Sequence, residues 1–263
     1  MKRCLTIAGS DSGGGAGLQA DLKTFTAFGV FGMSAVTAVT AQNTVAVSGV
    51  AEIRPDLVAA QIDAVASDIG IDAAKTGMLW CGAIVLAVAD AVARHRIPNL
   101  VVDPVMVSKT GARLLGEDAM EPLVGRLLPL AEVVTPNLPE AVALTGVEVK
   151  DEEGMREAAR RIHLLGPRAV VIKGGHLEGP DVVDLYYDGR SFEALRGERI
   201  ESRSTHGTGC TFAAALAAGL ALGNRPLDAV RRAKEYVAGA IRAAPRLGRG
   251  SGPLNHLHEL RRK

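Results

Sequence analysis

Short β-branched runs alternate with longer alanine-rich stretches along nearly the whole chain, and this alternation most constrains its fold. Residues 4–9 (CLTIAG) have the composition of a strand, whereas residues 17–29 have apolar side chains at the three- and four-residue spacing of a helix. The same reading predicts further strands at 34–42, 71–79, 99–106, 131–137 and 168–175, and further helices at 54–70, 82–96, 210–223 and 227–244. Strands separated by helices are joined by right-handed crossovers, so the pattern predicts a mainly parallel α/β sheet.

Residues 181–195 interrupt this rhythm. The stretch DVVDLYYDGRSFEAL alternates apolar and polar residues around an Asp-Gly turn, which is a strong hairpin signal. We therefore expect antiparallel strands at one edge of the sheet. The chain has 263 residues, a usual size for one large α/β domain, and it contains no repeat or linker. The sequence thus predicts a single domain over residues 1–263.

Composition excludes several classes of protein. The formal net charge of +1 gives no reason to expect a nucleic-acid groove or a membrane-binding patch. No run of 18 apolar residues occurs, and the N-terminus lacks the apolar core of a signal peptide. Cys4, Cys81 and Cys210 are too few for a disulfide framework or a zinc site. We expect a soluble cytoplasmic protein with reduced thiols and no nucleic-acid or membrane partner.

Polar residues gather where the predicted strands end. They are Asp11, Gln42, Asn43, Lys75, Thr76, Asp103, Asn137, Glu140 and Lys173, each at or just beyond the carboxyl end of a strand. Ligands of open parallel sheets bind along that edge. Any one of these residues could belong to an ordinary loop, but their shared position favours a common ligand site.

The first loop, residues 9–21 (GSDSGGGAGLQAD), is rich in glycine. It is not a phosphate-binding P-loop, because no Gly-Lys-Ser/Thr follows. The acidic residue that a dinucleotide-binding fingerprint needs about 20 residues later is absent. Two interpretations remain: a turn that lets a ligand approach the backbone, with Asp21 one helical turn inside, or a purely structural strand-to-helix turn.

A second glycine-rich segment, residues 204–213 (STHGTGCTFA), opens an apolar helix. Gly207 and Gly209 allow backbone N–H groups to converge, and the helix N-terminus adds its positive dipole end. This arrangement predicts an anion hole for a transferring phosphoryl group, and its field should favour the thiolate of Cys210. A buried, inert cysteine is the alternative, but it leaves the Gly-x-Gly pattern unexplained.

An activated Cys210 suits two kinds of enzyme. As a nucleophile it needs an imidazole base, and His206 is close in sequence although it precedes the turn. As a base it would take a proton from an alcohol that attacks a nucleotide phosphate. The second interpretation also uses Lys173 for phosphate charge and Asp103 and Glu140 for magnesium. We therefore favour phosphoryl transfer over thiol hydrolysis.

Seven segments occur in the order typical of one family. They are TIAGSDSGGGAGLQADLKTF, TAVTAQNT, KTGML, VVDPVM, TPNLPEA, IKGGH and THGTGCT, and GRGSGPLNHLHEL is similar to the family's C-terminal signature. From Leu5 to about Leu257 the chain resembles the hydroxymethylpyrimidine/phosphomethylpyrimidine kinases of thiamin biosynthesis, in the ribokinase-like superfamily. The resemblance implies a three-layer α/β/α fold with a mostly parallel central sheet.

The same resemblance implies an activity and a set of roles. The expected reaction is ATP- and Mg²⁺-dependent phosphorylation of 4-amino-5-hydroxymethyl-2-methylpyrimidine, and then of its monophosphate, by a homodimer. Gln42 would bind the aminopyrimidine edge, while Asp21, Gly9, Ala16, Gly77, Met78 and Val105 would line the pocket. Cys210 would be the base, beside an anion hole of Gly207, Thr208 and Gly209. Lys173, Asn137 and Lys234 would serve ATP, and Glu140 and Asp103 the metal.

Two of these expectations have explicit alternatives. Lys234 lies in a helix where a solvent-exposed position would explain it equally well. The activity could instead be that of a pyridoxal or pyridoxine kinase of the same branch, or the chain could be a non-catalytic pyrimidine-binding module. The mechanism requires Cys210 to lie within a few ångströms of the pocket formed by Gln42 and Met78.

Overall fold

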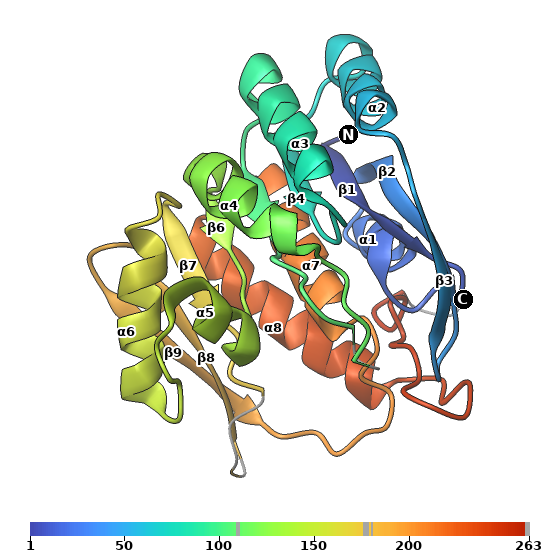
Figure 1. Cartoon of the computed structure of the whole chain (residues 1–263). Helices are drawn as coiled ribbons and strands as arrows, with labels where there is room; N and C mark the ends of the chain where they lie inside the picture. Colours follow the sequence, from blue (N-terminus) through green and yellow to red (C-terminus); the bar gives the residue numbers. More distant parts are fainter. Residues whose placement is uncertain (109–110, 176–178, 180, 261–263) are drawn as a thin grey trace.

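One nine-stranded sheet organises the molecule, in the order β3-β2-β1-β4-β5-β6-β7-β8-β9 (Figure 1). The computed structural model describes residues 1–108, 111–175, 179 and 181–260. The strands are β1 (Arg3–Asp11), β2 (Phe31–Gln42), β3 (Val47–Glu52), β4 (Ala73–Thr76), β5 (Leu100–Val102), β6 (Val133–Val134), β7 (Ala169–Ile172), β8 (Asp181–Tyr187) and β9 (Phe192–Glu198). From β2 through β7 neighbouring strands are parallel, which confirms the mainly parallel sheet.

Antiparallel strands flank this parallel centre on both sides. The predicted hairpin is formed by β8 and β9 around Asp188 and Gly189. At the other edge β3 pairs antiparallel to β2, and the sequence pattern does not predict this strand. Segment 47–52 (VSGVAE) is mostly exposed and contains a glycine, so it lacks the apolar run of a buried strand.

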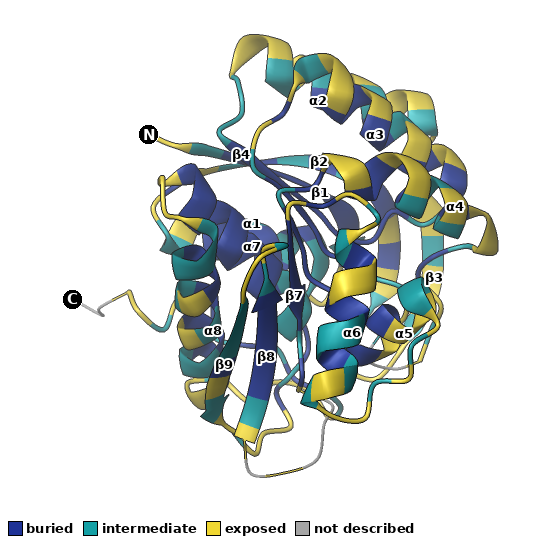
Figure 2. Ribbon diagram, turned by 90° about the vertical axis from the view of Figure 1, so that its left-hand side faces the viewer, coloured by how far each residue is buried: buried dark blue, intermediate teal, exposed yellow. Residues whose placement is uncertain are grey.

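Helices cover both faces of the sheet, as expected for three layers (Figures 1 and 2). One face is covered by α2 (Pro55–Asp68), α3 (Gly82–His95), α4 (Met120–Pro122), α5 (Leu138–Thr145) and α6 (Glu152–His163), together with the short turns η1 (Glu117–Ala119), η2 (Leu123–Leu127) and η3 (Leu128–Leu130). The other face is covered by α1 (Gly17–Ala27), α7 (Thr208–Ala221) and α8 (Pro226–Arg242). Within β1, Leu5 and Ile7 belong to the first core and Cys4 to the second, because successive side chains point to opposite faces.

Helix α7 is the central helix of its layer. Every residue from Thr211 to Ala221 is buried, since α7 packs against α1, α8 and the sheet. A helix that is apolar all round needs such surroundings. Its N-terminus is consequently held at one place, at the carboxyl edge of the parallel strands. No helix in the described part of the chain has both the length and the apolar character to cross a bilayer.

Candidate active site

The two glycine-rich segments, far apart in sequence, form one structure. Gly207 caps α7 with a φ of +83°, and a Cβ there would lie 1.8 Å from the carbonyl oxygen of Gly15. Only glycine permits both the backbone conformation and this approach. Gly17, at the end of the first loop, must also be glycine, because a Cβ there would lie 2.3 Å from the Gly9 carbonyl oxygen. The first loop therefore packs directly against the N-terminus of α7.

Two cavities meet at this N-terminus. The smaller, of about 450 Å³, lies between the first loop, β2 and α5, and the larger, of about 720 Å³, lies between β9 and α8. Asn137, Lys173, Thr208 and Gly209 line both. Backbone N–H groups of a helix's first turn have no partner within the helix, so they can face an anion at the junction.

Most of the predicted site residues line the smaller cavity. These are Gly9, Ala16, Gln42, Met78, Asp103, Val105, Asn137, Glu140, Lys173, Gly207, Thr208, Gly209 and Cys210. The cavity thus brings Cys210 together with Gln42 and Met78, as the mechanism requires. Asp21, Gly77 and Lys234 are not among its lining residues.

The structure places Asp21 beneath the site rather than in it. Its side chain is fully buried and pairs with Lys75, with Oδ2 2.9 Å from Nζ, and it also accepts a hydrogen bond from the Thr6 hydroxyl. Burial lowers the pKa of Lys75, but Asp21, together with the nearby Cys210 and Asp103, outweighs it, so the pKa of Lys75 is raised. Gly77 makes room for this pair, since a Cβ there would lie 2.8 Å from Nζ of Lys75. The expectation that Asp21 and Gly77 line the pocket is therefore corrected.

Lys234 lines the larger cavity and is not a solvent-exposed helix residue. Its Nζ donates to Oδ2 of Asp184 at 2.7 Å and to the carbonyl of Val182 at 3.0 Å. Asp184 in turn accepts from the backbone N–H of Gly174. The ammonium group is thereby held against β8, next to the segment that carries Lys173.

Lys173 and Asp103 form an ion pair between the two cavities. Nζ of Lys173 donates to Oδ1 of Asp103 at 2.8 Å, and the Thr135 hydroxyl donates to the same oxygen. Burial lowers the pKa of Lys173, but the Asp103 and Glu140 carboxylates outweigh it and the pKa is raised. A permanent positive charge therefore lies at the junction.

Asn137 and Glu140 form a capping box at the start of α5. The Asn137 side chain accepts from the Glu140 N–H, and the Glu140 carboxylate accepts from the Asn137 N–H. The spacing Asn-x-x-Glu before an apolar run is the sequence signal for this cap. Burial, aided by the nearby Asp103 charge, raises the pKa of Glu140 to about 7 despite the opposing Lys173.

Cys210 differs from the sequence expectation in its ionisation. Burial raises the pKa of its thiol to about 11, although Lys75 lowers it. The expectation that the helix N-terminus favours the thiolate is therefore not supported, because burial outweighs the charge of Lys75. The thiol still lines the smaller cavity beside the anion hole.

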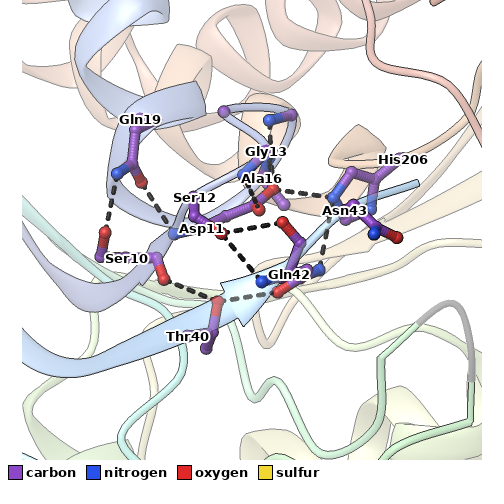
Figure 3. A network of polar contacts seen from close by, with 12 residues as sticks. Ser10, Asp11, Ser12, Gly13, Ala16, Gln19, Thr40, Gln42, Asn43 and His206 are labelled. Atoms are coloured by element: carbon purple, nitrogen blue, oxygen red, sulfur yellow. Dashed lines mark hydrogen bonds and ion pairs between the residues drawn. The ribbon is translucent and has the colours of Figure 1, made fainter. Parts of the chain in front are cut away.

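His206 and Asp11 also line the smaller cavity, and they contact each other there (Figure 3). Nε2 of His206 lies 2.8 Å from Oδ2 of Asp11 and 3.4 Å from Nε2 of Gln42. Burial raises the pKa of Asp11, but hydrogen bonds from His206, Ala16 and Gly13 outweigh it and lower the pKa. The polar contacts of the imidazole are thus with Asp11 and Gln42 rather than with Cys210. The sequence signal was a histidine directly before Gly-Thr-Gly.

Comparison with known proteins places this site in a family. The sequence profile of the family described as phosphomethylpyrimidine kinase matches residues 11–255. The hydroxymethylpyrimidine/phosphomethylpyrimidine kinase of Rhizobium meliloti is 51% identical over 257 residues, covering 97% of this chain and 96% of that protein. The thiamine biosynthesis bifunctional protein ThiED of Geobacter sulfurreducens is 55% identical over 253 residues, and the match covers 96% of this chain. The chain spans about half, 52%, of that bifunctional relative.

Solved structures agree in fold. The pyridoxal kinase of Staphylococcus aureus in complex with AMP-PCP and pyridoxal has a TM-score of 0.91 and 40% identity, covering 98% of this chain and 94% of that one. The phosphomethylpyrimidine kinase of Clostridium difficile has a TM-score of 0.82 and 42% identity, covering 92% and 100%. The chain thus has the expected ribokinase-like kinase fold and, by its sequence match over almost its whole length, belongs to the phosphomethylpyrimidine kinase family.

Proposed function

We propose that the chain transfers the γ-phosphoryl group of ATP to the hydroxymethyl oxygen of 4-amino-5-hydroxymethyl-2-methylpyrimidine, and then phosphorylates the monophosphate. The observation that carries this proposal is the junction of two cavities at the N-terminus of α7. An alcohol in the smaller cavity and a nucleotide in the larger would face each other across the backbone N–H groups of Gly207, Thr208 and Gly209. Catalysis of phosphoryl transfer depends mainly on such positioning and charge stabilisation.

The residues divide between the two ligands. Gln42, Met78 and Val105 would hold the pyrimidine, with one amide and two apolar side chains. Lys173 would neutralise phosphate charge at the junction, and Lys234 would approach the nucleotide from the larger cavity. As the new O–P bond forms, the alcohol proton passes to Sγ of Cys210 in its thiolate form and ADP leaves. Because burial raises the pKa of the thiol to about 11, only the small ionised fraction of Cys210 can accept this proton, so turnover should rise with pH.

Asp103 and Glu140 are suitable ligands for Mg²⁺. Both carboxylates line the smaller cavity, and their mutual repulsion contributes to the raised pKa of Glu140. Mg²⁺ is usually bound through one or two carboxylates together with phosphates and water, and these two carboxylates fit that pattern. When bound, the metal would offset negative charge on the phosphates. A homodimer and a cytoplasmic location remain predictions.

ADP release in the presence of ATP and Mg²⁺ tests the proposal directly. The pyrimidine alcohol, its monophosphate and pyridoxal are offered in parallel, with a no-acceptor reaction as control. We expect turnover on both pyrimidines well above that on pyridoxal, in line with identity near 50% to the curated pyrimidine kinases. Turnover on pyridoxal alone would assign the chain to pyridoxal phosphorylation. Binding without any turnover would favour the non-catalytic module.

A further inference from the structure

Thr40, Gln42 and His206 line the smaller cavity and form a chain of close polar contacts (Figure 3). The Thr40 hydroxyl oxygen is 3.1 Å from the end of the Gln42 amide that is drawn as Oε1, and Nε2 of His206 is 3.4 Å from the end that is drawn as Nε2. The backbone of Gln42 is also held, because its N–H donates to the Ser12 hydroxyl, which donates back to the Gln42 carbonyl. What remains to be determined is which end of the amide is oxygen and which is nitrogen.

The contact with Asp11 determines the role of His206. Oδ2 of Asp11 accepts the backbone N–H groups of Gly15 at 3.1 Å and Ala16 at 2.9 Å, and Nε2 of His206 lies 2.8 Å away. An ionised carboxylate can only accept, so Nε2 of His206 must carry a proton. This proton is directed at Asp11 and the nitrogen has no free lone pair, so His206 cannot accept a hydrogen bond from the near end of the Gln42 amide.

The contact with Ser10 determines the role of Thr40 in the same way. The Thr40 hydroxyl donates to the carbonyl of Ser10 at 2.8 Å. A hydroxyl has one proton, so toward Gln42 the Thr40 oxygen can only accept. The far end of the amide must then be the nitrogen. With the opposite orientation, two donors would face each other at His206 and two acceptors at Thr40.

The amide oxygen and nitrogen of glutamine are nearly isosteric, and a half-turn exchanges them without moving other atoms, so the network decides their positions. We propose that Thr40 and His206 are positioning residues that hold Gln42 with Oε1 toward His206 and Nε2 toward Thr40, and that this direction selects an aminopyrimidine over pyridoxal. The selectivity rests on the proposed function, because it assumes that Gln42 meets the polar edge of the ring.

The two rings present opposite patterns along that edge. Beside its hydroxymethyl group, the aminopyrimidine has an amine, which donates, and then a ring nitrogen, which accepts. At the equivalent positions pyridoxal has an aldehyde oxygen, which only accepts, and then a hydroxyl group. The hydroxymethyl group must reach the anion hole, which begins directly after His206, so the Oε1 end would meet the first group. Oε1 then accepts from the amine, and the second N–H of Nε2 donates to the ring nitrogen. Pairing with pyridoxal would need the half-turn that the network opposes.

Calorimetric dissociation constants of the two ring alcohols, measured without nucleotide, test the proposal. Thr40→Val keeps the side-chain shape and suits strand β2 but removes the acceptor for Nε2. Thr40→Ser keeps the hydroxyl. Since a lost hydrogen bond is worth about tenfold in affinity, we expect Thr40→Val to lower the preference for the aminopyrimidine about tenfold and Thr40→Ser to retain it. Equal weakening of both ligands by Thr40→Val, or no change in either, would overturn the proposal.

Gln42→Glu is a second variant that does not depend on the folding of the first. Its carboxylate can still accept from the amine but has no proton for the ring nitrogen, whereas the pyridoxal hydroxyl can donate to it. We expect the aminopyrimidine to lose at least tenfold in affinity and pyridoxal to lose less. An equal loss for both ligands would contradict the fixed orientation. Because these measurements involve no turnover, a failure of the proposed kinase activity would be seen separately, in the ADP-release assay.

Discussion

Replacing Lys75 by methionine should destabilise the protein more than most substitutions, because it leaves the Asp21 carboxylate buried without its countercharge. Both side chains have no exposed surface, and Nζ lies 2.9 Å from Oδ2. Removing one partner of a buried ion pair typically costs about 3–5 kcal/mol. The Thr6 hydroxyl still donates to Asp21, but one neutral hydrogen bond does not replace an ammonium group.

The magnitude should depend on pH. In the variant, burial raises the pKa of Asp21 with no Lys75 to oppose it, so the carboxyl takes up a proton in the native state. Protonating a carboxyl whose unfolded pKa is about 3.9 costs about 4 kcal/mol at neutral pH, which sets a ceiling on the loss. The native state then binds one more proton than the unfolded state, so the free energy of unfolding rises by about 1.4 kcal/mol per unit as the pH falls.

Urea unfolding at about pH 7 and about pH 5.5 measures this, and about 2 kcal/mol of the loss should be recovered at the lower pH. Lys75→Met/Asp21→Asn should regain much of the stability and lose the pH dependence, since no charge is left behind. Arg54→Gln is the control, because Arg54 and Asp56 form an exposed pair, with 79% and 71% of the side chains accessible, whose loss should cost less than about 1 kcal/mol. A loss in Lys75→Met that is equal at both pH values would refute the reasoning.

Two further predictions concern the titration of site residues. Cys210→Ala should lower kcat about 10²-fold or more. In the wild type we expect kcat/KM to rise with pH as a thiol of pKa about 11 begins to ionise, and the variant should lose this rise. Parallel pH profiles of the two proteins in initial-rate assays would contradict a base role. Glu140, with a pKa of about 7, must release its proton to bind Mg²⁺, so the Mg²⁺ concentration for half-maximal ADP release should rise below about pH 7. Glu140→Gln can keep the capping box and should flatten this dependence, whereas an unchanged dependence would remove Glu140 from the metal site.

Local pattern was sufficient for the architecture. The alternation of β-branched runs with helical stretches predicted each parallel strand and the helices α1, α2, α3, α7 and α8, because residues at a period of two or of three to four can bury only one face in the corresponding structure. The Asp188-Gly189 turn predicted the β8–β9 hairpin for a similarly local reason. Strand β3 was missed because its edge position leaves it mostly exposed, so its sequence lacks the alternation of apolar and polar residues that marks a half-buried strand.

The sequence also predicted that the site lies at the carboxyl edge of the parallel strands, and it predicted most of the residues that line the smaller cavity. A parallel sheet brings the carboxyl ends of its strands to one side, so Gln42, Asp103 and Lys173 had to lie along the same edge. The glycines before Cys210 located the helix N-terminus, since their conformational freedom is itself a sequence property. The sequence by itself therefore determined which residues gather at the site.

Only the tertiary structure decided which of those side chains face a ligand and how they are charged. Asp21 lies one turn into α1, and the packing of that helix against the sheet turns its carboxylate to Lys75 on β4, away from the cavity. The pKa of the Cys210 thiol is raised because burial outweighs the charge of Lys75, and the relative size of those effects depends on surroundings that no local motif encodes. His206 acquires its partner across the fold, from Asp11 at the end of β1. Burial and long-range pairing are properties of the packed chain, because they depend on which distant segments share one low-dielectric space.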